Sequence, residues 1–407
     1  ERVCGEDLDG DVLEALDSLV EQSLVRQSEG ADGQPRFRML QTIREFAMEQ
    51  AIESGRWDAL RERHAQLFRE LAEESGSQVM SSNKRPWLDR LEEEHDNLRA
   101  AFAWAQDVQA AELSLRMSAS LWRFWQMRGY LAEGLDRTTQ ALAMPHAADH
   151  PEARADALSA AAGLAYWLAD AQKARGFYEQ EIEARTALND RRGLAEALYG
   201  ISFTWSIIEL GTADAASNAT RYVTAALRIY EELEDAPGIG RCEWALANVA
   251  WGGRDLETAR AHAVRALETF ESIDDRFNFG WASYTLGLAA LSELATEGTP
   301  KQLEEARWRL SEALRIFDEA QDVTGYSLVL DAFAILALHE GDRQRAARLS
   351  GAVSRLERLS GTGLNTWNRG VLKFEPAELH ADPSLAEAWA EGEAFSPSEA
   401  VAYALES

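Results

Sequence analysis

The sequence has few cysteines, few prolines and no long apolar segment. Its 407 residues include only Cys4 and Cys242, which cannot form a disulfide framework and indicate a reducing compartment. We therefore expect a cytoplasmic protein. No apolar run approaches the ~20 residues that a membrane-spanning helix needs, so we expect no membrane partner. Because the chain starts with Glu1 rather than an initiator Met, we also expect it to be part of a longer protein.

Basic residues are also scarce relative to acidic ones. The chain has 41 Lys and Arg against 69 Asp and Glu, a net charge of −28 at pH 7. A general nucleic-acid surface needs a basic face, because the phosphate backbone dominates its affinity. The composition therefore argues against nucleic acid as a direct partner.

The motifs that carry common chemistries are missing. The sequence contains no Gly-x-x-x-x-Gly-Lys loop for binding phosphates, no His-Glu-x-x-His or Cys-x-x-Cys metal spacing, and no Gly-x-Ser-x-Gly nucleophile elbow. We therefore expect no enzyme activity in this chain, and no metal or other cofactor.

Residues 1–54 alone show β character. Residues 11–22 have apolar residues at helical spacing, and residues 41–54 do so again. Between them, two short alternating segments, 23–27 and 36–40, flank a turn rich in Gly and Asp at 29–33, which predicts a hairpin. Helix, hairpin and helix in this order indicate a partial winged-helix domain that lacks its first helices.

Helix predominates in the rest of the chain, where Ala, Leu, Glu and Arg are abundant. Residues 55–110 contain helical stretches at 56–74 and 85–106, each with one apolar stripe, and form a helical connector.

From residue 111 the chain repeats a pattern of two helices, and this repeat is its most informative feature. The aligned first-helix positions have spacings of 40, 40, 45, 40 and 47 residues and are Trp122, Ala162, Ser202, Ala247, Gly287 and Ala334. Each second helix carries an aligned alanine, at Ala174, Ala219, Ala259, Ala306 and Ala346. Small residues at fixed places let paired helices approach closely, and stacked pairs bury a continuous core.

The remaining residues, 359–407, differ from the repeats. Residues 361–378 contain Gly and Asn and are expected to form a loop. Ser396 to Glu399 form a capping box with Pro at the first helical position, which starts a last helix that closes the stack. The fold class is therefore mostly α: a partial winged helix with one β-hairpin (1–54), a connector (55–110), a superhelix of about six helix pairs (111–358) and a capping tail (359–407).

The helix pairs resemble the tetratricopeptide repeat, although units of 40–47 residues exceed its usual length. Longer motifs resemble the C-terminal region of bacterial STAND-type ATPase transcriptional regulators, of the LuxR or activator type or linked to an adenylate cyclase. These motifs are residues 16–25 and 36–47 for the winged helix, 87–101 for its linker helix, 121–129 for the first repeat, and 388–405 for the tail.

The resemblance implies a role in regulation. In that family an ATPase core precedes the winged helix, the repeats act as sensor or protein-binding arm, and the output is transcription or cyclic nucleotide synthesis. This chain lacks both the phosphate-binding loop and an output domain. Residues 1–53 hold five Arg against 13 Asp and Glu, a net charge of −8, so we expect the winged helix to contact protein rather than DNA.

The aromatic residues of the first helices are the candidate binding residues. In a tetratricopeptide stack the first helices line the concave face. The places expected to be exposed there lie three residues before the aligned small residue and one, four and five after it. The candidates for ligand or partner binding are Tyr166, Trp167, Tyr199, Phe203, Arg241, Trp244, Asn248, Trp251 and Tyr284. Arg123 and Glu196 could add polar specificity. Alternatively, most of these aromatic side chains are partly buried between neighbouring helices.

Two functions remain open from the sequence. The first is a non-catalytic sensor that binds a small-molecule inducer or a protein on the concave face and controls an ATPase core missing from this chain. The ligand, or the core itself, would then be the partner. The second is a tetratricopeptide scaffold that binds proteins without ligand switching.

Overall fold

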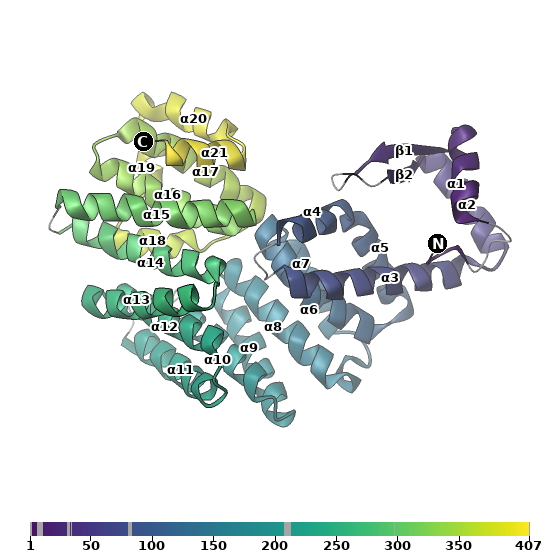
Figure 1. The fold of residues 1–407 in the computed structure, drawn as a ribbon, viewed down its shortest axis with the longest axis horizontal. Coiled ribbons are helices and arrows are strands. Elements are labelled where there is room, and N and C mark those ends of the chain that lie inside the picture. Colours follow the sequence, from purple (N-terminus) through teal and green to yellow (C-terminus); the bar gives the residue numbers. More distant parts are fainter. Residues whose placement is uncertain are drawn as a thin grey trace. The chain divides into compact units, whose positions relative to one another are not determined.

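The computed structural model describes residues 2–5, 11–30, 33, 35–79, 84–206, 213–296 and 298–406. Within these ranges helices predominate and the strands form a single two-stranded sheet, which confirms the predicted fold class (Figure 1). The chain forms two compact units. The first consists of residues 1–121 and 140–154, and the second of residues 122–139 and 155–407.

The first unit begins with the predicted helix, hairpin and helix. Their bounds are α1 (Val12–Glu21), β1 (Val25–Glu29), β2 (Pro35–Met39) and α2 (Gln41–Glu53). Asp11 starts α1 by accepting a hydrogen bond from the Leu13 amide at 2.8 Å. The strands are antiparallel, and Arg26 lies opposite Arg38. Much of the predicted turn, Ala31 and Asp32, lies outside the described residues.

The helical connector differs from the prediction at one point. It contains α3 (Trp57–Gln78), α4 (Arg85–Glu93) and α5 (His95–Val108), so the stretch expected at 85–106 is interrupted at Glu94. Arg36 of β2 binds the carboxylates at this interruption: its Nη2 donates to Glu93 at 2.7 Å, and its Nη1 donates to Glu94. The hairpin is therefore tied to the junction of α4 and α5.

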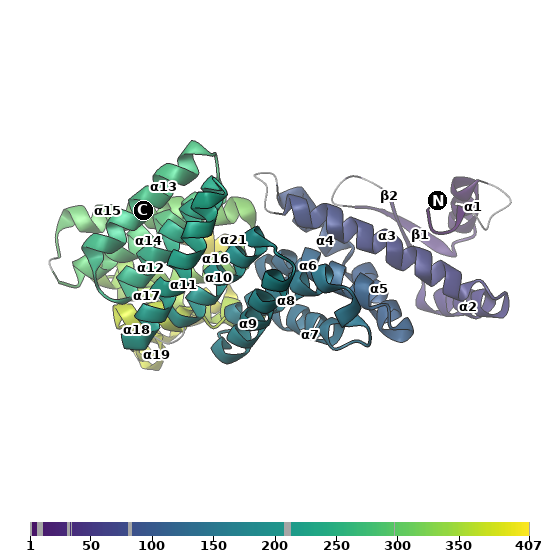
Figure 2. The same cartoon turned by 90° about the horizontal axis from the view of Figure 1, so that it is seen from below.

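The second unit contains the stacked helix pairs (Figures 1 and 2). It takes in the end of α6 (Ala111–Arg128) and the start of α7 (Leu131–Leu142). The following pairs are α8 (Pro151–Trp167) with α9 (Ala171–Ala187), α10 (Arg191–Ser206) with α11 (Ala213–Glu232), α12 (Ala236–Gly252) with α13 (Leu256–Ser272), α14 (Arg276–Leu294) with α15 (Pro300–Ala320), and α16 (Val323–His339) with α17 (Arg343–Ser360). The aligned alanines of both helices are buried, as the repeat predicted.

A recurrent turn joins successive helices of this unit. A residue with positive φ ends one helix, and the next residue, an aspartate, accepts an amide hydrogen bond from the first turn of the following helix. Ala169 (φ 60°) and Asp170 form such a turn, with the Lys173 amide donating at 3.1 Å. The same arrangement starts the helices after Asp190, Asp235, Asp255, Asp275, Asp322 and Asp342.

The C-terminal segment is more ordered than the sequence indicated. The loop expected at 361–378 contains α18 (Asn365–Leu372) and the start of α19 (Pro376–Ala381), so that expectation is wrong. Helix α18 has no side-chain cap, and tertiary contacts stabilise it. The capping box at Ser396 is confirmed and starts α21 (Pro397–Leu405).

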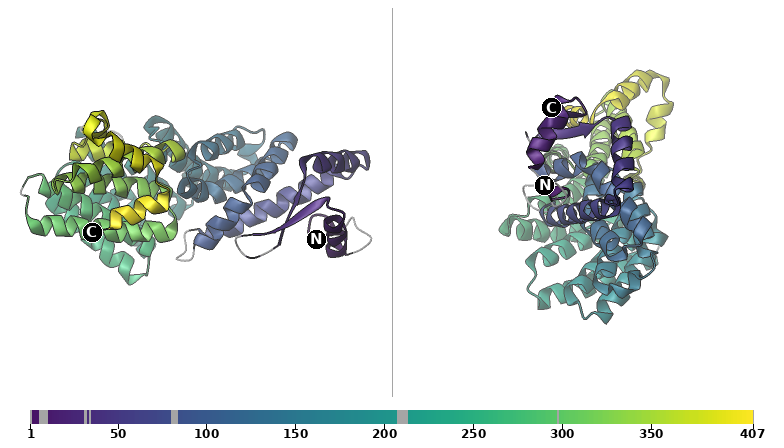
Figure 3. Two further views of the ribbon diagram at one scale, coloured as in Figure 1. Left: turned by 90° about the horizontal axis from the view of Figure 1, so that it is seen from above. Right: turned by 90° about the vertical axis from the view of Figure 1, so that its right-hand side faces the viewer.

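Helix α20 (Ala386–Ala394) packs closely on α17, and the yellow C-terminal helices lie beside the green ones in Figure 3. A Cβ atom on Gly392 would lie 1.9 Å from the carbonyl oxygen of Arg348, so only glycine permits this approach. In the described part of the chain, no helix is long and apolar enough to cross a membrane.

Candidate ligand-binding face

The first helices of successive pairs bring most of the predicted aromatic residues together. Ring centroids lie 5.0 Å apart between Tyr199 and Phe203, 5.2 Å between Phe203 and Trp244, and 5.8 Å between Trp244 and Trp281. Trp167 of α8 also contacts Trp281 of α14, at 6.0 Å. A continuous set of rings therefore connects α8, α10, α12 and α14.

Trp281 is a central ring of this set that the sequence reasoning missed. It contacts Phe317 of α15 at 4.5 Å as well. It lies six residues before the aligned Gly287, as Glu196 and Arg241 lie six residues before their aligned positions. The repeat register therefore contained a signal for Trp281, at a place that the predicted set of exposed positions left out.

Burial divides the nine predicted residues into two groups. Tyr166, Tyr199, Arg241 and Trp244 are half-buried. The expected exposure is wrong for the others, which are buried: Trp167, Phe203, Asn248, Trp251 and Tyr284. For this second group the alternative expectation, burial among neighbouring helices, holds.

Helix α18 accounts for part of this burial. Its Trp367 packs edge-on against Trp251, with ring centroids 4.7 Å apart, and its Asn368 donates to the Tyr284 hydroxyl. Two of the predicted binding residues therefore already contact a segment of the same chain.

Polar contacts hold α18 in this position. The Arg369 guanidinium donates to both carboxylate oxygens of the buried Asp331, at 2.9–3.1 Å. Burial raises the pKa of Asp331 to about 6, although Arg369 opposes this rise. Arg254 of the turn before α13 donates to the Val371 carbonyl at 2.6 Å.

The turn before α18 reaches the second helix pair. The Gly363 amide and the Thr362 hydroxyl both donate to the Trp167 carbonyl, each at 3.2 Å. The segment from Thr362 to α18 therefore contacts α8, α12, α14 and α16, and it occupies the inner face of the later pairs.

The inner face of the earlier pairs carries a charged cluster. Arg241 of α12 donates to both oxygens of Glu196 in α10, at 2.6 and 2.7 Å, and the Tyr230 hydroxyl donates to the same carboxylate at 2.7 Å. Burial raises the pKa of Glu196, but the Arg241 guanidinium and these hydrogen bonds outweigh it and hold this pKa at about 2. Glu196 is therefore ionised at neutral pH.

Glu196 stays accessible in spite of these bonds, because 39% of its side-chain surface remains exposed. We use the name charged cluster for Glu196, Tyr230 and Arg241.

Arg123 of α6 has an electrostatic interaction with Glu196 of this cluster. Its guanidinium stacks on the Trp122 ring at 3.7 Å and donates to the Gln126 amide oxygen at 3.4 Å. Desolvation lowers the pKa of Arg123, and the nearby Glu196 opposes that change. Burial raises the pKa of Tyr199, whose ring lies 5.2 Å from the Arg241 guanidinium.

Two glycines make room for the aromatic rings of Trp122 and Tyr178. A Cβ atom on Gly163 would lie 2.8 Å from the Trp122 ring, and one on Gly200 would lie 2.4 Å from the Tyr178 ring. Side chains at these places would displace both rings, so glycine is needed where α8 and α10 face them.

Within the described ranges, no group of three or more His, Cys, Asp or Glu side chains could hold a metal ion. Burial raises the pKa of Cys242, so its thiol is protonated at neutral pH and is a poor nucleophile.

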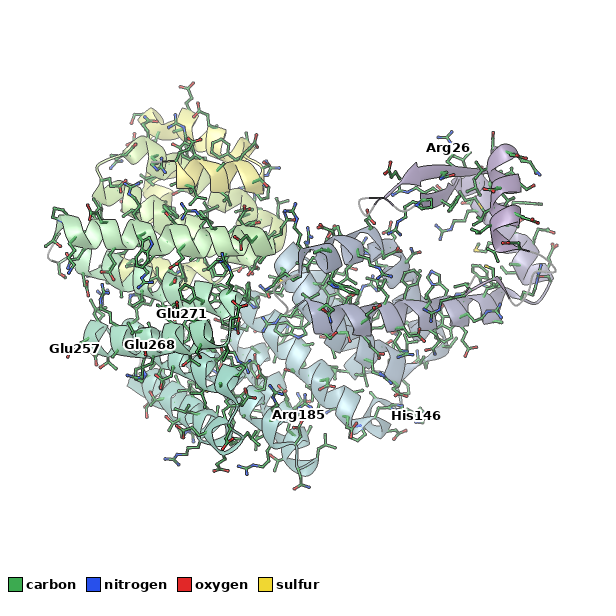
Figure 4. All side chains as sticks on the ribbon, in the orientation of Figure 1. Arg26, His146, Arg185, Glu257, Glu268 and Glu271 are labelled. Atoms are coloured by element: carbon green, nitrogen blue, oxygen red, sulfur yellow. The ribbon has the colours of Figure 1, made fainter. Side chains whose placement is uncertain are left out.

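The arginines of the winged-helix hairpin differ in their surroundings. Arg26 on β1, labelled in Figure 4, is exposed, as is Arg38 opposite it. Arg36 is engaged with Glu93 and Glu94, and α1 carries Glu14, Asp17 and Glu21 without a basic residue. This arrangement leaves the helix face acidic.

Comparisons with known proteins identify a match for the winged-helix segment and matches over a larger part of the chain. Residues 1–51 match a family model described as a winged helix-turn-helix domain. Over 303 residues the chain is 30% identical to proteins named "Putative HTH-type transcriptional regulator" from Mycobacterium bovis and from Mycobacterium tuberculosis. The match covers 70% of this chain and 32% of each relative, so the chain spans about a third of their length.

Solved structures with a similar arrangement of helices include a Rap protein in complex with the competence and sporulation factor. That structure has a TM-score of 0.48 and 14% identity, over 85% of this chain and 97% of the Rap chain. Aspartyl phosphate phosphatase F from Bacillus subtilis has a TM-score of 0.39 and 16% identity, over 82% of this chain and 91% of that one.

Proposed function

We propose that this chain is the non-catalytic sensor and protein-interaction arm of a transcriptional regulator. The inner face of the stacked pairs binds a ligand or partner, and the winged-helix segment passes the resulting change to an ATPase core of the STAND type elsewhere in the protein. The observation that carries the proposal is the charged cluster of the inner face, where side chains from α10, α11 and α12 meet around a partly exposed ion pair.

The order of the parts supports the regulatory role. A winged helix-turn-helix match is followed by stacked helix pairs, and relatives more than twice as long are named transcriptional regulators. The acidic α1 and the engaged Arg36 support a winged helix that contacts protein rather than DNA.

The mechanism is a shift between two states. A ligand that contacts α6, α10 and α12 together favours the packing in which these helices are close. The ligand can shift the equilibrium between the two states of an attached core by no more than the difference between its binding free energies for the two packings.

Trp244 provides a direct test of binding at the inner face. Calorimetric screening of the 407-residue chain against sugars and metabolites should identify a compound whose binding Trp244→Ala weakens at least about tenfold, because Trp244 is a half-buried wall of the face. Trp308→Ala is the matched control, since this side chain is 54% exposed on α15. Circular dichroism would establish that both variants fold.

Binding that Trp244→Ala leaves unchanged would contradict the proposal. In the full-length protein, the transcriptional response to the compound should disappear with the same substitution and persist with the control.

A protein scaffold is the second candidate, and α18 favours it specifically. This helix shows that the inner face accepts a short helical segment through Trp367, Asn368 and Arg369. If only polypeptides bind to the inner face and none changes transcription, the scaffold is the correct function.

A further inference from the structure

A surface cavity of about 390 Å³ is lined by the end of α13, the turn after it, the start of α14, and α15. This volume lies within the range of small-molecule sites, roughly 300–1,000 Å³. None of the described residues that line it belongs to the charged cluster or to the set of rings on the inner face. We call this site the α15 cavity.

Apolar side chains form part of the lining. Phe270 and Ile316 are buried, and Phe279 is half-buried. Trp308 of α15 also lines the cavity, although its side chain is 54% exposed. An apolar group of a ligand would therefore lose water-exposed surface here together with Trp308, which favours binding.

Trp308 is an exception among the tryptophans. All thirteen lie within the described ranges, and the other twelve are buried or half-buried. Trp308 comes two residues after the aligned Ala306. The same place in the other second helices with an aligned alanine holds no aromatic residue, but Gly176, Arg221, Ala261 and Arg348. The packing of the repeats therefore does not account for an indole ring at this place.

The charged side chains around the cavity include two ion pairs. Arg276 of α14 lies 3.2 Å from the Glu319 carboxylate of α15, and Arg309 lies 3.5 Å from the Glu312 carboxylate. Each pair is neutral, so neither decides the net charge of the site.

Two further carboxylates give the cavity its charge. Glu271 and Asp274 are exposed, and within the described part of the chain no basic side chain lies within ion-pair distance of either. Arg315 offsets one of these charges, which leaves the site with an excess of one carboxylate. Glu257 and Glu268 are further exposed carboxylates of α13 (Figure 4), and the whole chain has a net charge of −28. The electrostatic potential in the cavity therefore favours a cation.

Trp308 already contacts one guanidinium. The Arg309 guanidinium lies 4.0 Å from the centroid of its ring and covers one face of it. Arg309 itself does not line the cavity, whereas Trp308 does. A second planar cation can therefore stack on the indole surface that Arg309 leaves open.

We propose that the α15 cavity binds a planar organic cation, a guanidinium or an amidinium, that carries an apolar group. The cation stacks on Trp308 and forms ion pairs with Glu271 and Asp274, and the apolar group packs against Phe279. Such a cation binds a carboxylate through two parallel N–H groups and also stacks on an aromatic ring. The assignment goes beyond the proposed function, because the cavity shares no residue with the inner-face site. The cation is either a free small molecule or the side chain of an arginine in a partner polypeptide.

Probes of the same shape and different charge test this assignment. We would measure binding of benzamidine and of its neutral counterpart, benzamide, to the 407-residue chain by isothermal titration calorimetry. The second pair is the amide of N-acetyl-phenylalanyl-arginine and the same peptide with citrulline, which is neutral, in place of arginine.

The expected result is that the cation of at least one pair binds at least about tenfold more tightly than its neutral counterpart. Trp308→Ala should weaken binding of the cation at least about tenfold, and Trp244→Ala, on the inner face, should leave it unchanged. Glu271→Gln should lower the preference for the cation about threefold. Glu268→Gln, at an exposed carboxylate of the same helix that does not line the cavity, is the matched control and should not lower it.

Equal binding of cation and neutral counterpart, or no binding of either cation to the folded chain, would overturn the assignment. So would a preference that survives Trp308→Ala, or one that Glu268→Gln lowers as much as Glu271→Gln does. None of these failures bears on the proposed function, which is tested through Trp244. The pair that shows the preference identifies the source of the cation.

Discussion

Glu181 occupies the place in α9 where the second helices of three other pairs carry Ala226, Ala266 and Ala313. Its side chain is fully buried, and burial raises its pKa from the ordinary 4.5 to about 8. Arg185, whose Nε lies 3.6 Å away, opposes only part of this rise. Most Glu181 side chains are therefore protonated at pH 7.

Glu181→Gln should make the protein more stable at alkaline pH. Because the folded pKa is raised, the unfolded chain releases this proton near pH 4.5 and the folded chain near pH 8, so the wild type loses stability between these values. Glutamine keeps the size and removes this loss. We expect a gain of ~1–3 kcal/mol in the free energy of unfolding at pH 8.5 and almost none at pH 4.5.

Urea denaturation at both pH values measures this difference. Glu183→Gln, at an exposed position of the same helix, is the matched control and should have a small effect at either pH. A loss of stability at pH 8.5 in Glu181→Gln would show that the carboxylate is ionised and stabilising.

Single residues were predictable where the repeat register determines their environment. Ala162, Ala247 and Ala334 are buried as expected, because each lies where two helices approach closely. The burial of Trp251 and Tyr284 was not predictable in this way. Their environment depends on α18, which comes from a segment about 80–120 residues further along the chain.

At the scale of elements, helices with strong patterns were predicted and α18 was not. Its eight residues include Gly370 and lack a side-chain cap, so local propensity does not indicate a helix. Contacts of Arg369 with Asp331 and Glu357 stabilise it, and these partners lie on other helices. The turns in which a positive-φ residue is followed by Asp differ from α18, because each turn depends only on residues that are close in sequence.

Arg369→Gln should release α18 in a pH-dependent manner. It leaves Asp331 buried without its cation, which costs ~3–5 kcal/mol when the carboxylate is ionised. Burial already raises the pKa of Asp331 to about 6 and also raises that of Glu357, and without Arg369 both values should rise further. The loss should therefore be largest at pH 8 and smaller at pH 4, where protonation removes the charge.

Urea denaturation at the two pH values tests this expectation as well. Arg358→Gln is the control, because it removes an exposed ion pair with Glu393 and should cost at most ~1 kcal/mol. Equal losses in the two variants, or a loss in Arg369→Gln that does not change with pH, would refute the role assigned to Arg369.

At the scale of the whole molecule, the order of the parts was predicted but the closure of the second unit was not. A linear stack has contacts only between neighbouring pairs. Here the buried Gln126 of α6 donates to Asp322 at 3.1 Å and to Thr324, and Arg128 donates to Gln321 at 3.2 Å. Helices of the first and sixth pairs therefore meet, through residues almost 200 positions apart that no repeat pattern relates.

Gln126→Ala should lower the stability of both ends of the second unit together. The substitution removes a donor from the buried Asp322 carboxylate, which should cost ~1–3 kcal/mol. Because the contact joins the first and sixth pairs, hydrogen exchange should accelerate in α8 and in α16, and not only next to the substitution. Gln180→Ala, at an exposed glutamine of α9, is the matched control and should change stability by less than ~0.5 kcal/mol. If exchange accelerates in α6 and α8 but not in α16, the pairs behave as a linear stack and the closure does not couple the ends.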